Sequence, residues 1–396
     1  MFIGKNLNTI RMLRGYSRKE LAGKINVTEQ AIWQYEVKNL MPDIKNIYDL
    51  SQIFNVKTNF FLNDTHKIFD DDLNVKRSHI AFRSLNHNIN NKIIYKQHMQ
   101  AVFLNNLTNL LYGFLKVPDS LFIKLSSEVQ NIIEKSGSRN DTIAEVAKVA
   151  RNYLMPNEYS SKDLLFNLEK SGVVIYEKQI DEDADAYSFW TEDKKHAFII
   201  LGNDKNIAVR RSFDLAHELG HLLLHQNVEF ELLDTKEYRV IEEEANIFAS
   251  MFLLPEDEFK KDFDQINKKS NPDSYIMIKE KWFVSYQMIA VRAYKLNLIS
   301  QQQYRYFWMS INKKGYKKRE PLDDKLIIDR PMKIKSIFKL LFNNNVINIE
   351  KVLEEMHVEI DFLSEYTGIE KDFFKEYLSE KQNSSMFIEK NFKIKN

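Results

Sequence analysis

The sequence predicts an α+β protein that is mostly helical. Apolar residues recur at a spacing near 3.6 through 1–62, through 95–133 and from about 316 onward, a pattern typical of amphipathic helices. Three short strand-like runs are confined to 172–179, 186–191 and 196–201, with charged turns between them. Short strands joined by such turns favour an antiparallel meander. We therefore predict a small antiparallel sheet in an otherwise helical chain.

The composition excludes several kinds of partner and of metal site. With 396 residues, the chain is long enough for two or three domains. Its net charge of +1 gives the whole molecule no strong attraction to nucleic acid or anionic lipid. There are no cysteines, so a metal site would have to use His, Asp and Glu. No apolar run is long enough for a signal peptide or a membrane span, and we expect a cytoplasmic protein with no membrane partner.

Four segments are expected along the chain. Residues 1–62 form a compact run of short helical patterns. Residues 63–155 are rich in Asn and Lys and are expected to be a helical spacer; this segment is a candidate dimer element, so a homodimer is one expected state. Residues 156–310 hold the strand-like runs and the helices after them, and residues 316–396 form a charged helical subdomain.

The strongest chemical signal is the sequence HELGH at residues 217–221. His217 and His221 are four residues apart in a predicted helix, so both imidazoles leave the same face one turn apart and can reach one zinc ion. Glu218 would flank that metal as a general base that takes a proton from zinc-activated water. The alternative is a surface helix with two solvated histidines. It is disfavoured because apolar residues surround the motif, and buried polar groups need partners.

A catalytic zinc needs a third protein ligand. A third histidine six residues after the second is excluded, because that position is Asn227. His225 would lie more than about 10 Å along a straight helix from the first histidine, and we interpret it as a structural or rim residue. In the segment 240–256, Glu244 borders an apolar helix face and is the candidate ligand, whereas Glu242 and Glu243 read as solvated residues that favour a helix N-terminus.

The segments RRSFDLAHELGHLLLH (210–225) and EEEANIFASMFLLP (242–255) resemble the ImmA/IrrE family of metallopeptidases, and the likeness extends over about 153–305. The resemblance implies a gluzincin-like domain that binds Zn²⁺. It also implies that His217, His221 and Glu244 are the metal ligands and that Glu218 is the catalytic base. Family members cleave repressor-type transcription factors, so a protein substrate of that kind is the implied partner.

Arg211 and Asn246 also match recurrent positions of that family, and the resemblance implies supporting or packing roles for both.

An extended substrate can pair with a free strand edge beside a zinc cleft. The aromatic run 187–190 is the candidate edge, which makes Tyr187 and Phe189 the candidate substrate-binding residues. The alternative, that these aromatics belong to the core, stays open. Tyr187, His196 and Tyr286 are candidates for stabilising the oxyanion, and the sequence does not choose between them.

The N-terminal segment 17–36 carries a second signal. Ser17 and Glu20 form a capping-box pattern at the start of one helix, and Thr28 caps the next. This segment resembles the helix-turn-helix (HTH) of XRE/Cro-type repressors, whose second helix enters the major groove. A glycine that follows Tyr-Glu in that family is replaced here by Val37, which puts the geometry of the turn in question.

The resemblance implies that residues 28–36 form the recognition helix. Arg18 and Lys38 are the expected phosphate contacts. The other candidate DNA-binding residues lie at the recognition helix, namely Thr28, Glu29, Gln30 and Gln34. Nine Lys/Arg against five Asp/Glu in 1–62 give a local charge of +4. The alternative is a similar helical bundle that makes protein contacts only.

Together the two modules predict a DNA-binding zinc metalloprotease that hydrolyses peptide bonds in a repressor-like or antitoxin-like protein. Such an enzyme would control transcription in a stress response or in a mobile-element or phage-defence system. The alternative is an HTH transcriptional regulator whose zinc domain is a sensor or interaction module without protease activity. The intact motif favours hydrolysis, because a purely structural metal site would not need Glu218.

Overall fold

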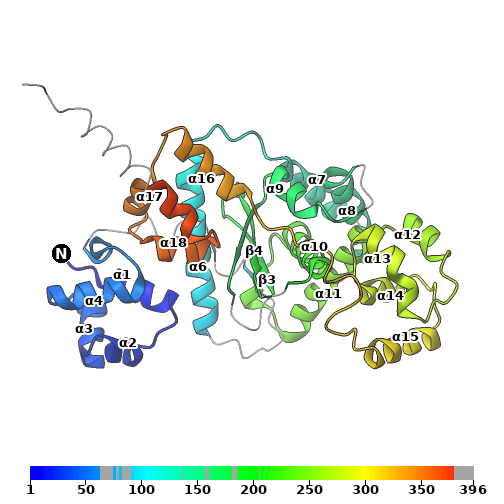
Figure 1. Ribbon diagram of the computed structural model, residues 1–396, viewed down its shortest axis with the longest axis horizontal. Helices are drawn as coiled ribbons and strands as arrows, with labels where there is room; N and C mark the ends of the chain where they lie inside the picture. Colours follow the sequence, from blue (N-terminus) through cyan, green and yellow to red (C-terminus); the bar gives the residue numbers. More distant parts are fainter. Residues whose placement is uncertain are drawn as a thin grey trace, which may run out of the picture. The chain divides into compact units, whose positions relative to one another are not determined.

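The computed structural model describes residues 1–62, 75–76, 80–82, 91–135, 137–156, 160–180, 185–204 and 206–378. These residues form two compact units, which we describe separately. The helical unit comprises 1–77, 86–117 and 332–396, and the sheet unit comprises 78–85 and 118–331. Figure 1 shows the elements of both units, and the mostly helical α+β fold class predicted from the sequence is confirmed.

The N-terminal part of the helical unit is a bundle of short capped helices. It contains α1 (Gly4–Leu13), α2 (Arg18–Lys24), α3 (Glu29–Lys38), α4 (Ile44–Phe54) and the 3-10 turn η1 (Thr58–Phe61). Ser17 and Glu20 form the predicted capping box at α2, and Thr28 accepts a hydrogen bond from a backbone N–H of the first turn of α3. Asn39 ends α3 in the left-handed conformation. Asn39, two residues after Val37, therefore makes the left-handed turn for which the repressor pattern uses glycine.

Residues from the C-terminal part of the chain complete the helical unit. They form α16 (Lys333–Asn343), α17 (Ile349–Glu355) and α18 (Ile360–Thr367). The long helix α6 (Asn91–Tyr112) contacts α1, α16 and α18. The ring of Phe103 in α6 lies 5.0 Å from that of Phe362 in α18. A backbone bridge joins Val56 to Val358, so residues far apart in the sequence share one core.

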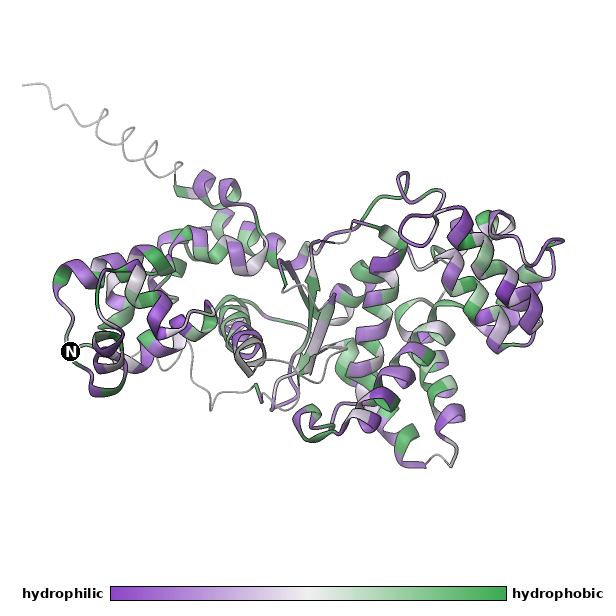
Figure 2. Cartoon of the chain, turned by 90° about the horizontal axis from the view of Figure 1, so that it is seen from below, coloured by the Kyte–Doolittle hydropathy of each residue, from purple (hydrophilic) through white to green (hydrophobic). Residues whose placement is uncertain are grey.

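These compact units do not follow the four predicted segments. Residues 91–117 of the expected spacer pack with the N-terminal helices, whereas α7 (Leu121–Lys135) and α8 (Arg139–Leu154) belong to the sheet unit. The expected C-terminal subdomain is also divided, since 316–331 belong to the sheet unit; its last residues, 379–396, lie outside the described chain. Polar and apolar residues alternate along the helices, as Figure 2 shows. This periodicity identifies the apolar face of a helix but not the element that covers that face.

The sheet has the strand order β1-β3-β4-β2. Its strands are β1 (Ala81–Phe82), β2 (Val174–Lys178), β3 (Ala186–Trp190) and β4 (Ala197–Gly202). β3 runs antiparallel to both β4 and β1, but β2 is parallel to β4, so the predicted wholly antiparallel sheet is wrong. β2 and β3 are buried along their whole lengths. Such strands lack the polar–apolar alternation from which pairing could be predicted.

Helices of the same unit form one large apolar core with one face of this sheet. Besides α7 and α8, they are α9 (Leu164–Ser171), α10 (Ala208–Leu224), α11 (Thr235–Leu253), α12 (Glu256–Phe263), α13 (Ile276–Trp282), α14 (Tyr286–Lys295) and α15 (Gln301–Lys313). The central helix α10 packs against α11 on one side and β3 on another. No helix among the described residues is both long and apolar enough to cross a membrane.

Candidate metal centre

The two histidines of the HELGH segment lie together on the buried helix α10. The Nε2 atoms of His217 and His221 are 3.1 Å apart, and both residues are buried. One helical turn separates them, as the spacing of four predicts. Two nitrogens that each lie about 2.0–2.1 Å from one tetrahedral zinc are about 3.3 Å apart. The observed separation therefore suits two ligands of the same ion.

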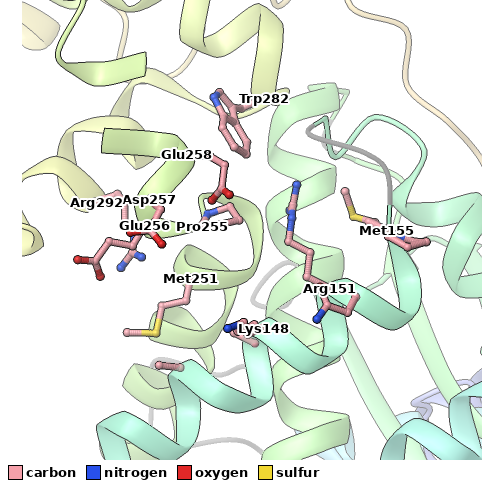
Figure 3. Close-up of a pocket in the computed structure, with 14 residues that line it drawn as sticks. Lys148, Arg151, Met155, Met251, Pro255, Glu256, Asp257, Glu258, Trp282 and Arg292 are labelled. Carbon is pink, nitrogen blue, oxygen red and sulfur yellow. The ribbon is translucent and has the colours of Figure 1, made fainter. Parts of the chain in front are cut away.

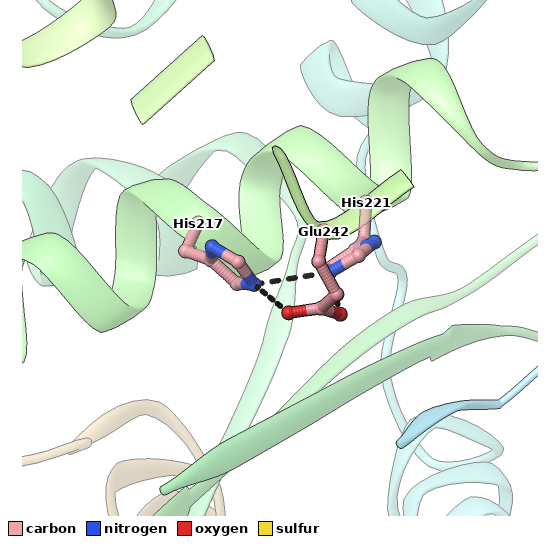
Figure 4. A group of neighbouring side chains, drawn as sticks. All are labelled: His217, His221 and Glu242. Carbon is pink, nitrogen blue, oxygen red and sulfur yellow. Dashed lines mark hydrogen bonds and ion pairs between the residues drawn. The ribbon is translucent and has the colours of Figure 1, made fainter. Parts of the chain in front are cut away.

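Glu242 of α11 brings a carboxylate to this histidine pair (Figure 4). Its Oε2 lies 3.5 Å from Nε2 of His217, and its Oε1 lies 3.3 Å from Nε2 of His221. One ligand atom from each of the three residues falls within 4.8 Å of the others. Two imidazoles and one carboxylate are the ligand set of a catalytic zinc site that keeps a position open. We call these three residues the metal group.

The predicted third ligand, Glu244, is not part of the metal group. Its carboxylate accepts hydrogen bonds from Nε and Nη2 of Arg139 at 2.8 and 2.6 Å, and from Nε2 of His225 at 2.9 Å. Burial alone would raise the pKa of Glu244, but the hydrogen bonds from Arg139 and His225 lower it to about 2. Residues two apart point to nearly opposite sides of a helix. Glu242, which the sequence suggested was solvated, is therefore the residue turned toward His217 and His221.

Further contacts orient both histidines. The Nδ1 atom of His217 donates to Oδ1 of Asn246 at 3.0 Å, which turns Nε2 of the ring toward the metal group. His225 donates through Nε2 to Glu244, and burial lowers the pKa of His225 to about 4, so its ring is neutral at pH 7. Its Nδ1 therefore accepts from Nδ1 of His221, 3.1 Å away. This contact turns Nε2 of His221 toward His217.

The donor set fits a bound cation. Both Nε2 atoms face each other and the Glu242 carboxylate, and both histidines are buried. Without a positive charge among them these atoms would repel one another, and their desolvation would be uncompensated. Asn246 and His225 with Glu244 are the supporting partners commonly seen behind metal-bound histidines.

A glycine allows α10 and α11 to approach closely enough for Glu242 to reach the histidines. A Cβ atom on Gly220 would lie 3.0 Å from Cδ1 of Phe248 and 3.3 Å from the Cα of Ala245. The small residues Gly220 on α10 and Ala245 on α11 therefore set the spacing between the two helices. The glycine of the HELGH segment has a packing function in addition to the roles of its neighbours.

Glu218, the predicted catalytic base, is buried beside the first histidine on α10. Arg211 serves packing: its Nη2 donates to Oε1 of Glu177 and to the carbonyl of Gly202, both at 2.8 Å, which ties α10 to β2 and β4.

The predicted substrate-binding strand differs from expectation. Tyr187 and Phe189 are buried, and the Phe189 ring stacks on Phe198 at 4.8 Å, which is the core interpretation left open by the sequence. The edge of β3 that faces away from β4 is not free either, because β1 pairs with Tyr187 and Ser188. β1 comes from a segment more than one hundred residues earlier, so local sequence could not predict this pairing.

A cavity of about 700 Å³ in the sheet unit contains none of the metal group. It lies among α8, α11, α12 and α13, and Figure 3 shows its lining. Arg151 and Arg292 at this cavity donate to the carbonyls of Phe252 and Leu254 at the C-terminal end of α11. These guanidinium groups stabilise the helix end, so the cavity is better explained by structure than by catalysis.

At the N-terminal module, Glu29 and Gln30 are exposed in the first turn of α3, and Lys38 is exposed in its last turn. Gln34 is half-buried. These positions leave one face of α3 accessible. The side chain of Thr28 is used as the helix cap.

Arg18 differs from its predicted role as a phosphate contact. Its Nε donates to Oε2 of Glu36 at 2.6 Å, and Arg11 donates to the other carboxylate oxygen of the same residue. The Glu36 side chain is fully buried. Arg18 therefore stabilises the joint between α2 and α3. The sequence signal for DNA contact did not separate this ion pair from a phosphate contact.

Comparison with known proteins agrees with both parts of the chain. A family model described as IrrE N-terminal-like domain, of the Peptidase M78 family, matches residues 168–294, and a helix-turn-helix model matches residues 7–61. The chain is similar to the SPbeta prophage-derived uncharacterized HTH-type transcriptional regulator YonR of Bacillus subtilis (strain 168), with 38% identity over 69 residues, 17% of this chain and 64% of the relative.

The chain is also similar to the HTH-type transcriptional regulator ImmR of the same organism, with 36% identity over 62 residues, 16% of this chain and 49% of the relative. The match thus covers less than two thirds of either relative's length. The chain joins an N-terminal helix-turn-helix domain to an IrrE-like domain of the Peptidase M78 family.

Proposed function

We propose that this chain is a DNA-binding zinc metalloprotease that hydrolyses peptide bonds in a regulatory protein. The observation that carries the proposal is the metal group: two buried histidines with Nε2 atoms 3.1 Å apart, and a carboxylate from a second helix facing both. A site of this composition, next to a buried glutamate on the same helix, has the parts of a hydrolytic centre.

In this proposal His217, His221 and Glu242 hold the ion. Zinc, when bound, supplies Lewis-acid polarisation of a peptide carbonyl and makes water more acidic at neutral pH. Glu218 accepts the proton of the attacking water and passes it to the leaving amine. Asn246 keeps the first histidine in the tautomer and orientation that ligation requires.

The N-terminal module supports binding to DNA in this proposal. The accessible face of α3, with Glu29 and Gln30 in its first turn, has the position of a recognition helix. The local charge of +4 favours a phosphate backbone. Both matched relatives are named as transcriptional regulators, which supports a regulatory protein as the substrate and transcription control as the outcome. A cytoplasmic location agrees with this function.

A second candidate is a transcriptional regulator whose zinc domain is a sensor without protease activity. The names of the two relatives favour it, because both describe regulators and neither describes an enzyme. The buried glutamate beside the histidine pair favours hydrolysis instead, since a sensor site needs metal ligands but no general base.

The experiment that separates the two candidates replaces Glu218 with glutamine. We expect Glu218→Gln to retain zinc, measured by elemental analysis, and to lose cleavage of purified YonR, ImmR and casein. Glu243→Gln is the matched control, because that side chain is 67% exposed on the adjacent helix. If wild type and Glu218→Gln leave all three proteins equally intact, the protease proposal is wrong.

The DNA part is tested separately by a gel shift on the promoter region of the chain's own gene. We expect Gln30→Ala with Gln34→Ala to weaken binding, whereas Tyr48→Ala, at an exposed site on α4, should not. Unchanged affinity in the double variant would favour a module that makes protein contacts only.

A further inference from the structure

A cavity of about 570 Å³ lies beside the metal group in the sheet unit. It is lined by residues of α10, α11, α14 and α15, together with Asp185 before β3 and Lys317 after α15. It is separate from the cavity of Figure 3, with which it shares no lining residue. Nothing in the metal chemistry described above requires a cavity here.

Two lining residues, Asn246 and Phe213, connect the cavity to the metal group, because each of them contacts His217. On α11, Glu242, Asn246 and Ser250 follow one another at steps of four residues and so lie along one face; the last two line the cavity. On α10, Phe213 lines it one turn before His217, and the two rings are 6.2 Å apart. A substrate whose scissile peptide bond lay at the metal group would therefore have this cavity next to it, within about one helical turn, or about 5.4 Å.

The lining identifies the side chain that the cavity would accept. Five of its residues are large and apolar, namely Val209, Phe213, Met288, Val291 and Trp308. Its charged residues include two acids, Asp185 and Asp214, and two bases, Arg210 and Lys317, so their charges cancel. An apolar lining favours burial of an apolar group, whereas balanced charges give no preference for an acidic or basic one.

The guanidinium group of Arg210 is held by hydrogen bonds to the backbone. Its Nη2 atom donates to the carbonyls of Lys317 and Lys318 at 2.9 and 2.8 Å. Gln287 donates to the same Lys317 carbonyl at 3.2 Å. These bonds brace the wall formed by residues 317–318 against α10 and α14, so the cavity has a fixed boundary rather than an adaptable loop.

We propose that this cavity is the specificity pocket of the peptidase, and that it selects a large apolar residue, such as leucine or phenylalanine, adjacent to the scissile bond. The proposal rests on the proposed zinc peptidase function. It assigns Val291 and Trp308 as specificity-determining residues: both line the cavity from helices that carry no metal ligand.

The test measures binding rather than cleavage. Zinc-loaded protein is titrated by calorimetry with acetohydroxamic acid and with the hydroxamate of N-acetyl-leucine, which share a metal-binding group and differ in the side chain. Burial of a leucine side chain should tighten binding at least about tenfold relative to acetohydroxamic acid. The hydroxamate of N-acetyl-aspartate should show no such gain.

Two variants test whether this cavity causes the tighter binding of the leucine hydroxamate. Val291→Trp should fill it and remove the preference for leucine while acetohydroxamic acid still binds. Asn152→Trp, which lines the other cavity, is the matched control and should keep the preference. If Val291→Trp does not fold, Trp308→Ala provides the second measurement, because a widened cavity should lower the leucine preference severalfold.

The outcomes separate this inference from the proposed function. Equal affinity for the leucine and acetyl hydroxamates, or a leucine preference that survives both cavity variants, overturns the specificity pocket. A preference that is present in a protein that cleaves nothing overturns the protease and keeps the pocket. A wild-type chain that binds no zinc overturns both.

Discussion

Substitution of Glu242 and substitution of Glu244 should lower the affinity for zinc by different amounts, and the difference is large enough to measure. Glu242 faces both histidine Nε2 atoms at 3.3–3.5 Å, whereas Glu244 reaches the metal group only through His225. Under the proposed assignment, Glu242→Gln removes a zinc ligand. Glu244→Gln weakens a contact that orients one.

The structure and general magnitudes give the expected sizes. Structural zinc sites release about 10–16 kcal/mol on binding. An even division over three protein ligands assigns about 3–5 kcal/mol to Glu242, or a loss of about two to four orders of magnitude in affinity. Loss of a supporting contact costs about 10- to 100-fold, which is the range expected for Glu244→Gln.

The assay is competition with a chromogenic zinc chelator at pH 7, with circular dichroism to confirm that each variant is folded. Glu243→Gln, whose side chain is 67% exposed, should bind zinc as wild type does. A Glu244→Gln variant that loses more affinity than Glu242→Gln would refute the assignment, and would restore Glu244 as the ligand first expected from the sequence.

Three further substitutions test packing contacts, one in the sheet unit and two in the helical unit. Gly220→Ala should destabilise the protein by about 1–3 kcal/mol in urea unfolding, because the added Cβ meets a ring carbon at 3.0 Å; Gly23→Ala, which meets nothing within 4 Å, should be neutral or stabilising. Glu36→Gln leaves the buried Arg11 without its countercharge and should cost about 3–5 kcal/mol; an unchanged unfolding midpoint would contradict this. Phe362→Ala should cost about 3–5 kcal/mol, measured in the same way, and a smaller loss would show that its packing on α6 is not required.

The histidine pair could be predicted from the sequence because the chemistry depends on a local spacing. Four residues on one helix fix the relation between His217 and His221, whatever the rest of the chain does. The caps at Ser17 and Thr28 were predictable for the same reason, since each depends on residues within one turn.

The third ligand could not be chosen in this way. Three consecutive glutamates, 242–244, differ only in the direction in which they leave α11, and that direction has meaning only relative to α10. The available signal was the step of four residues from Glu242 to Asn246, which places the ligand on the face of the residue that supports His217. The pairing of β1 with β3 had no local signal at all, because the two strands are about one hundred residues apart.

The chain path through the two units affects how this protein can be synthesised and dissected. The helical unit requires residues 332–378 as well as the N-terminal helices, and the whole of 118–331 lies between them. The sheet unit is thus an insertion within the helical unit. During translation the IrrE-like domain is complete before the N-terminal bundle receives its last helices. A stop codon shortly after residue 331 should therefore spare the metal group and damage the unit that contains the first residues of the chain.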